Sequence, residues 1–209
     1  MSELVSLIAA GGPVSIVLVF LSVVALAMTL LKVWQFFASG VGRHRSISPA
    51  LSSWTSGRHD EALQSLNGKS SPATRVLKHA FANAAHFSKS LEAAREDVLR
   101  TAQEELRDMR RYLRGIEVIA QSAPLLGLLG TVIGMIQAFS QLEAAGSAVD
   151  PSRLAGGIWT ALLATALGLA IAIVFSIAGA WLESRVDNER SVIETTLSGY
   201  FAHQGRQQH

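Results

Sequence analysis

Three long stretches of the sequence carry no ionisable side chain, and they constrain the fold more than any other feature. The intervals are residues 4–31, 118–142 and 154–182, and none contains Asp, Glu, Lys, Arg or His. Each exceeds the roughly 20 residues that an α-helix needs to cross about 30 Å of hydrocarbon. A chain with 49% hydrophobic and 16% charged residues is also too apolar for an ordinary soluble domain. The sequence therefore predicts an all-α integral membrane protein with three transmembrane helices.

The distribution of Lys and Arg predicts the orientation of these spans, because positive residues near membrane ends stay in the cytoplasm. Residues 1–12 carry none and the 143–153 loop carries only Arg153, whereas 32–114 carries fourteen. The first interval is too long for the apolar region of a signal peptide and no Lys or Arg precedes it, so we interpret it as a retained span. The amino terminus is predicted to lie outside, in the periplasm, and the carboxyl terminus in the cytoplasm.

The predicted domains follow from these crossings. They are an outside N-terminus with transmembrane helix 1 (1–36), a cytoplasmic helical domain (37–114), transmembrane helix 2 (115–142), an outer-side loop (143–153), transmembrane helix 3 (154–183) and a cytoplasmic C-terminal helix and tail (184–209). Within the cytoplasmic domain, "GRHDEALQSL" predicts a short helix, and Ser71 with Pro72 predicts the start of another. No Gly or Pro interrupts 91–114, so this helix is expected to run straight into the second span, and the third span is expected to continue past Glu183. The last residues, "HQGRQQH", are expected to fray.

Small side chains line one face of each of the last two predicted spans. Helices in lipid associate through close packing of small residues rather than through a hydrophobic force. The positions that we expect to pack are Gly127, Gly130, Gly134 and Ala138 in the second span, and Gly157, Ala161, Ala164, Gly168 and Ala172 in the third. One chain with three spans offers too few helices to bury both faces. We therefore infer a homo-oligomer, a partner helix, or both.

Three threonines and one proline lie within the last two apolar spans. Thr131 and Thr165 lie near the middle of the small-residue faces, and Thr160 lies nearer the outer end of the third span. A single membrane threonine more often bonds to its own helix backbone, but two on such faces favour a functional role. Pro124 lacks an N–H, so we expect it to kink or loosen the second span near its cytoplasmic end.

The absence of ionisable groups inside the spans limits the chemistry of the chain. A proton-conducting site usually needs a carboxylate or an imidazole within the membrane. This chain therefore either conducts nothing or relies on an acid supplied by a partner. No HExxH or GxSxG motif occurs, so we predict that the chain is not an enzyme and holds no metal or cofactor. A net charge of +2 without a compact basic patch argues against a nucleic-acid partner.

The segments "APLLGLLGTVIGMIQAF" and "GGIWTALLATALGLAIAI" resemble the MotA/TolQ/ExbB proton-channel family, and they are most similar to its ExbB and TolQ branch. The resemblance extends to the outside amino terminus with "GGP", the three spans and the large cytoplasmic insert. It implies a pentameric ring in the inner membrane around single-span partners similar to ExbD or TolR, whose membrane Asp carries the proton. Thr131 and Thr165 match the family's pore-lining threonines. Members of this branch commonly have Glu where this chain has Thr160, and we assign Thr160 to the proton pathway together with Thr131 and Thr165.

The resulting prediction is the channel-forming stator subunit of a proton-motive-force transducer that energises envelope transport or integrity. The further partners that the resemblance implies are the lipid bilayer and a TonB- or TolA-like protein. Two alternatives stay open: a non-conducting membrane scaffold, and a MotA-like motility stator subunit. The sequence leaves open whether the ion is H⁺ or Na⁺.

Overall fold

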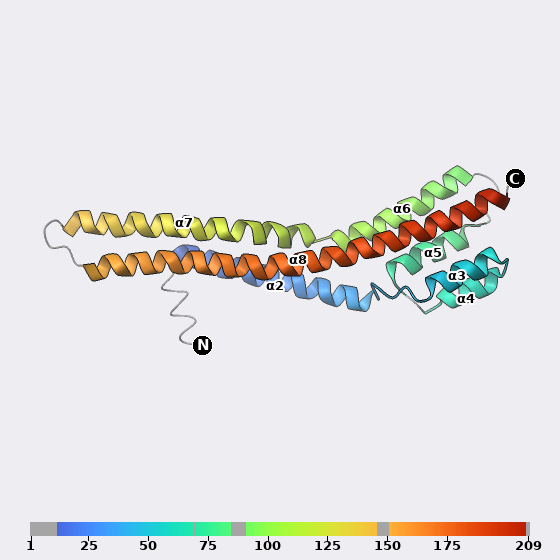
Figure 1. Ribbon diagram of the computed structural model, residues 1–209, viewed down its shortest axis with the longest axis horizontal. Helices are drawn as coiled ribbons and strands as arrows, with labels where there is room; N and C mark the ends of the chain where they lie inside the picture. Colours follow the sequence, from blue (N-terminus) through green and yellow to red (C-terminus); the bar gives the residue numbers. More distant parts are fainter. Residues whose placement is uncertain (1–11, 69, 85–90, 146–150, 208–209) are drawn as a thin grey trace. The chain divides into compact units, whose positions relative to one another are not determined.

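The computed structural model describes residues 12–68, 70–84, 91–145 and 151–207, and within these ranges every regular element is a helix. The helices, labelled in Figure 1, are α2 (Gly12–Ala38), α3 (Ile47–Thr55), α4 (His59–Leu66), α5 (Pro72–Ala82), α6 (Leu91–Arg110), α7 (Leu113–Ala145) and α8 (Pro151–Gln207). Three helices are long and apolar enough to cross a membrane, as the sequence predicts. The predictions for residues 1–11, 146–150 and 208–209 lie outside the described residues.

The chain divides into two compact units. The first comprises Met1–Leu31 with Tyr112–Ala180, and the second comprises Lys32–Arg111 with Trp181–His209. The first unit holds nearly all of the three uncharged intervals, and the second holds most of the charged residues. The division therefore follows the polarity of the sequence.

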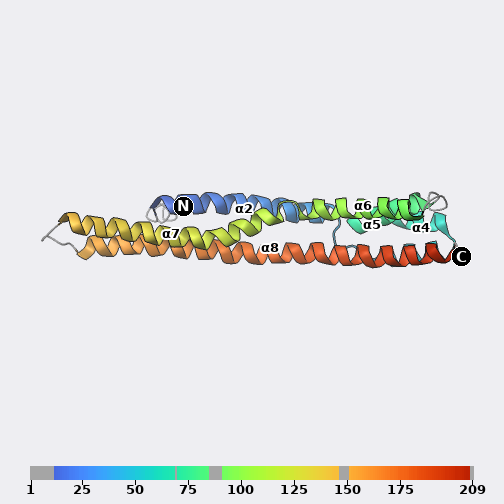
Figure 2. The same cartoon turned by 90° about the horizontal axis from the view of Figure 1, so that it is seen from above.

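In the first unit, α7 and the beginning of α8 lie side by side and run antiparallel (Figure 1, Figure 2). The contacts pair later residues of α7 with earlier residues of α8, as Gly134 with Ala161 and Gly127 with Ala164 illustrate. The part of α2 within this unit packs against α7, because Val14 approaches Gly130 and Met28 contacts Gly115. The unit is thus a three-helix arrangement in which glycines occupy the closest approaches.

The second unit packs α3, α4, α5 and α6 around the last part of α8 through an apolar core. The rings of Trp54 and Phe81 stack with their centroids 4.1 Å apart. The buried Tyr200 hydroxyl donates a hydrogen bond of 2.9 Å to the carbonyl oxygen of Ala80, and burial raises the pKa of Tyr200 to about 12. This core fixes the end of α8 to α5.

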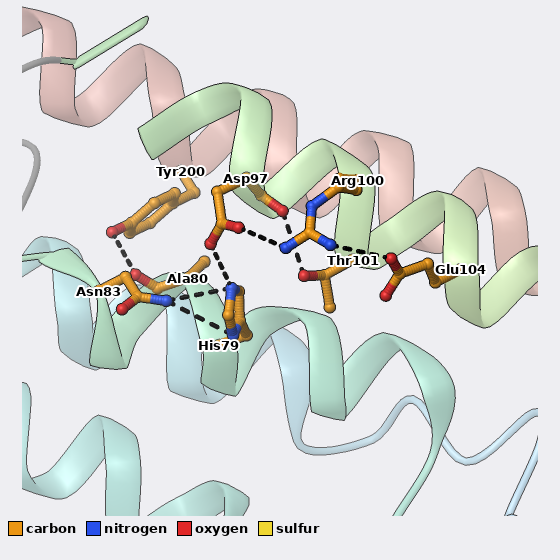
Figure 3. Close-up of polar contacts among 8 residues, drawn as sticks. All are labelled: His79, Ala80, Asn83, Asp97, Arg100, Thr101, Glu104 and Tyr200. Atoms are coloured by element: carbon orange, nitrogen blue, oxygen red, sulfur yellow. Dashed lines mark hydrogen bonds and ion pairs between the residues drawn. The ribbon is translucent and has the colours of Figure 1, made fainter. Parts of the chain in front are cut away.

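A polar cluster beside this core ties α5 to α6 (Figure 3). His79 Nε2 lies 2.7 Å from Asp97 Oδ2, and Arg100 Nη2 donates to Asp97 Oδ1 at 2.9 Å. The hydrogen bonds from Arg100 and His79 lower the pKa of Asp97 below its usual value of 3.8. Arg100 also reaches Glu104 one turn further along α6.

Several local predictions are confirmed. The "GRHDEALQSL" helix corresponds to α4, and α5 begins with Pro72 in its first turn after Ser71, whose hydroxyl accepts a hydrogen bond of 3.2 Å from the Thr74 N–H. The third span continues far past Glu183, since α8 extends without a break to Gln207. The helix α3 has no counterpart among the predictions.

Two predictions are wrong. The helix starting near residue 91 does not continue into the second span, because Tyr112 adopts a left-handed conformation with φ of 71° and separates α6 from α7. The Tyr112 carbonyl instead accepts the first hydrogen bonds of α7, from the N–H groups of Gly115 and Ile116. The C-terminal residues were expected to fray from His203 onward, yet α8 remains helical to Gln207.

Candidate functional site

The interface between α7 and α8 is built at the glycines that the sequence singles out. A methyl group added to Gly127 would lie 3.0 Å from the Ala164 carbonyl oxygen and from the Thr165 α-carbon. At Gly130 and Gly134, a methyl would lie 2.8 Å from the β-carbons of Ala164 and Ala161. Such separations are shorter than carbon–carbon van der Waals contact, so the two backbones approach because side chains are absent.

The third span contributes glycines to the same interface. A methyl on Gly157 would lie 2.8 Å from the Ala138 β-carbon, and one on Gly168 would lie 2.5 Å from the Ala123 carbonyl oxygen. Ala172 is buried in the same helix. The helix α7 continues through Pro124, which lies one residue after Ala123.

The packing corrects one step of the sequence reasoning. The two small-residue faces were expected to need helices from outside the chain, but they pack largely against each other. A single chain buries them because α7 and α8 are antiparallel and their glycines fall opposite alanines and glycines. An oligomer would therefore use the outer faces of these helices, which carry exposed residues such as Leu128, Ile136 and Ile173.

Thr165 bridges the two helices. Its hydroxyl donates a hydrogen bond of 2.9 Å to the carbonyl oxygen of Gly127, across the interface. The approach is possible because Gly127 has no side chain, so its carbonyl is open to α8. Thr165 is therefore held at the small-residue interface, and its position is stabilised by a bond that valine would lack.

Thr131 lies one turn beyond Gly127 on α7. Its hydroxyl donates to the Leu128 carbonyl oxygen at 2.6 Å, within its own helix. Thr131 is half-buried and also borders an open groove on α7. The Thr165 hydroxyl of α8 thus meets α7 at Gly127, one turn before Thr131. The Thr131 hydroxyl instead bonds within α7.

Thr160 is half-buried on α8, five residues before Thr165. At about 100° per residue, this spacing sets Thr160 about 140° around the helix from Thr165. The two side chains therefore belong to different faces of α8, and Thr160 is separated from the hydrogen bond between Thr165 and Gly127.

Two buried charged residues in the second unit were missed by the sequence reasoning. Lys32 is fully buried, and its Nζ donates bonds of 2.9 Å to Gln35 Oε1 and to the Asp108 carbonyl oxygen in the last turn of α6. A cation is favourable there because a helix C-terminus presents unpaired carbonyl groups. The sequence gives little indication that Lys32 is buried, because Lys32 is simply the first charged residue after the uncharged interval 4–31.

Glu189 is the other buried charge, on α8. Its Oε1 accepts a hydrogen bond of 3.0 Å from the Ala73 N–H, and its Oε2 accepts one of 3.1 Å from the Gly42 N–H. His44 Nε2 lies 3.5 Å from Oε2. Ala73 lies in the first turn of α5, where backbone N–H groups lack helical partners. Nothing in the polar run around Glu189 distinguishes it from its exposed neighbours.

The three uncharged intervals contain only apolar and neutral polar side chains. Among the described residues, no group of three or more His, Cys, Asp or Glu side chains could hold a metal ion. The groups available for chemistry in these spans are hydroxyls and backbone carbonyls. Fold and site together define a multi-pass, all-α membrane protein with two closely packed, hydroxyl-bearing helices.

The comparison with protein families identifies the family to which this membrane protein belongs. The profile of the MotA/TolQ/ExbB proton channel family matches residues 68–195, which is more than half of the chain. The chain therefore belongs to the MotA/TolQ/ExbB family, and its relatives place it in the ExbB branch. The matched region contains α7 with Thr131 and the membrane part of α8 with Thr165.

Individual relatives agree with this assignment. The chain is 34% identical over 134 residues to a biopolymer transport ExbB homologue of Methanothermobacter thermautotrophicus, covering 64% of this chain and 46% of that protein. It is 40% identical over 114 residues to the biopolymer transport protein exbB1 of Vibrio cholerae, covering 54% and 48%. An ExbB-like protein of Synechocystis is 28% identical over 169 residues, covering 78% and 77%. The chain thus spans about half the length of the Methanothermobacter and Vibrio proteins.

Proposed function

We propose that this chain is the channel-forming stator subunit of a proton-motive-force transducer in the bacterial inner membrane. It would assemble as a homo-oligomer, a pentamer in the proposed form, around a single-span protein similar to ExbD or TolR. The observation that carries this proposal is the family match over residues 68–195, which includes both threonine-bearing helices. The biopolymer transport names of the relatives favour a role in energising envelope transport.

The division of chemistry between the subunits follows from the spans. This chain offers hydroxyls at Thr131 and Thr165 but no ionisable group between residues 118 and 142 or between 154 and 182. A protonatable group must then come from the partner, as a membrane Asp. A proton that crosses the membrane releases about 2.3 kcal/mol per 100 mV, in addition to the pH term. This energy is comparable to the cost of switching one helix packing for another.

The topology proposed from the Lys and Arg distribution sets residues 37–114 and 184–209 in the cytoplasm and 143–153 on the periplasmic side. With this orientation, the polar residues of α3 to α6 and the last part of α8 lie in water. A TonB- or TolA-like protein would receive the mechanical output of the complex on the other side of the membrane.

Replacement of the two threonines tests the channel function. Thr131→Val and Thr165→Val keep the shape of the side chain and remove the hydroxyl. We expect both variants to lose proton-motive-force-dependent transport in a strain that lacks the native gene, while the complex still assembles. Thr29→Val is the matched control, because the Thr29 hydroxyl in α2 donates to the Ala25 carbonyl oxygen of its own helix and to no other described residue. Copurification of a single-span protein with a membrane Asp tests the partner.

One observation favours a non-conducting scaffold as the second candidate. Both hydroxyls already have acceptors, Leu128 O for Thr131 and Gly127 O for Thr165, so packing alone could account for them. A scaffold predicts that transport survives in Thr131→Val and that Thr165→Val fails only through weaker assembly. Copurification with a partner from a motility system, in place of one similar to ExbD or TolR, would instead make this chain a MotA-like motility subunit.

A further inference from the structure

A shallow groove runs along the face of α7 that is turned away from the small-residue interface. Its walls are mostly apolar, and the side chains that form them are Val132, Met135, Ile136 and Phe139. Thr131 borders one end of this groove, and Ser140 and Glu143 border the other. Val132, Ile136 and Phe139 are about half exposed, so the described residues leave this face uncovered.

The groove connects the middle of the second span with its outer end. Positions 132, 136, 139 and 143 recur at intervals of three and four residues, which keeps them on one face of the helix. Thr131 and Glu143 are twelve residues apart, or about 18 Å along the helix axis at about 1.5 Å per residue. Glu143 is the first ionisable residue after the uncharged interval 118–142. It therefore stands at the boundary between the apolar span and the outer loop.

We propose that Glu143 is the outer access residue of the ion pathway, and that its carboxylate draws monovalent cations to the mouth of the groove that leads to Thr131. This inference rests on the function proposed above. A carboxylate beside low-dielectric walls raises the local concentration of cations. Rings of Asp or Glu are a general device of cation-selective pores, and an oligomer of this chain would present one Glu143 per subunit.

The carboxylate of Glu143 is available for such a role. Glu143 is exposed, and no described side chain forms an ion pair or hydrogen bond with it. Glu117, near the other end of α7, differs because it accepts a hydrogen bond of 3.1 Å from Gln121 Nε2. The two acids at the ends of α7 therefore have different surroundings, and only the outer one borders the groove.

The apolar middle of the groove explains why Glu143 would attract ions without conducting them alone. Between Ser140 and Thr131 the groove is bordered by hydrophobic side chains over about 13 Å of helix. Apolar side chains offer an ion no polar ligand to replace its hydration shell, so ions are not expected to pass along this stretch unaided. Glu143 thus supplies ions, and passage beyond it depends on the partner's acid.

The absence of cysteine from the sequence makes this proposal testable with one substitution. The full chain carrying Glu143→Cys is purified through an affinity tag with its copurifying partners and reconstituted into liposomes, and proton and Na⁺ uptake are followed with dyes. A methanethiosulfonate reagent then attaches either a sulfonate or a trimethylammonium group to Cys at position 143. At 10 mM salt, Glu143→Cys should lower the initial rate of cation uptake about threefold, because the negative charge is lost. The sulfonate should restore this uptake rate, and the trimethylammonium group should lower it further.

Salt and control variants separate charge from structure. The differences in uptake rate between the native chain, Glu143→Cys and its two modified forms should vanish near 1 M salt, where the screening length falls to about 3 Å. Asp60→Asn, which removes an exposed carboxylate from α4, should leave the rate unchanged. Equal rates with both reagents, or a loss that salt does not remove, would overturn the role of Glu143. After such a result, an inactive Thr131→Val variant would mean that only the inference about Glu143 fails. A Thr131→Val variant that conducts normally, or a native complex that conducts no ion, would mean that the proposed function fails as well.

Discussion

The buried carboxylate of Glu189 is the residue on which the second unit is expected to depend most. Its two oxygens accept hydrogen bonds from separate backbone N–H groups, at Ala73 and Gly42. Glu189→Gln keeps the size of the side chain but replaces one oxygen by an NH₂ group. One of the two N–H groups then faces another donor and loses its partner.

The expected cost follows from that one lost acceptor. A buried donor without a partner costs about 1 to 3 kcal/mol. Since about 1.4 kcal/mol is a factor of ten, this corresponds to roughly a five- to 150-fold rise in local opening. Glu189→Ala removes both acceptors and should cost roughly 2 to 6 kcal/mol, twice the cost of one unpaired buried donor.

Hydrogen exchange of the backbone amides measures this effect directly, because protected amides exchange through local opening. In Glu189→Gln, peptides containing residues 42 and 73 should exchange faster by the stated factor. Glu194→Gln on the same helix is the control, since Glu194 forms an exposed pair with Arg190 and such pairs contribute little. Unchanged exchange at 42 and 73 in Glu189→Gln would refute the argument that these bonds stabilise the unit.

Two further predictions concern packing and acid stability. Gly134→Ala should lower the thermal midpoint of the detergent-solubilised protein, at a cost of about 1 to 3 kcal/mol, because the new methyl would lie 2.8 Å from a β-carbon of α8; Gly156→Ala, with no atom within 4 Å, should not lower it. Asp97→Asn should destabilise the protein at neutral pH but not in acid. Arg100 and His79 lower the pKa of Asp97, so its contribution is present above its unfolded pKa near 3.8 and is lost as pH falls through the lower folded value. Unfolding curves from pH 7 to 2 that keep a constant difference would contradict this.

The three spans could be predicted because each is a long run of residues without ionisable side chains. The described residues of each uncharged interval belong to a long helix, and Gly127, Gly130 and Gly134 lie where an added methyl would meet α8. What the sequence could not give was the partner of each face. Small residues indicate that a helix packs closely, but not whether the neighbouring helix belongs to the same chain.

The break at Tyr112 and the burial of Glu189 were missed for a different reason. Tyr has no local preference for a positive φ, so nothing in "MRRYLRG" marks the end of a helix there. Glu189 lies in a run whose charges look alike, and it is buried only because residues 42 and 73 meet α8 in the folded unit. Both features come from tertiary contacts across more than a hundred residues of sequence or from local strain, which periodicity does not record.

The helix α8 is much longer than one membrane crossing requires. Its 57 residues extend about 85 Å at about 1.5 Å per residue, and roughly 20 of them suffice to cross the hydrocarbon. The helix has no break between Pro151 and Gln207, so its backbone hydrogen bonds continue well beyond residue 182, where the uncharged interval ends. The same cannot hold for α6 and α7, where the left-handed residue interrupts the ladder of hydrogen bonds. The chain therefore leaves its third uncharged interval within an unbroken helix, but it enters the second one shortly after a residue at which helical hydrogen bonding stops.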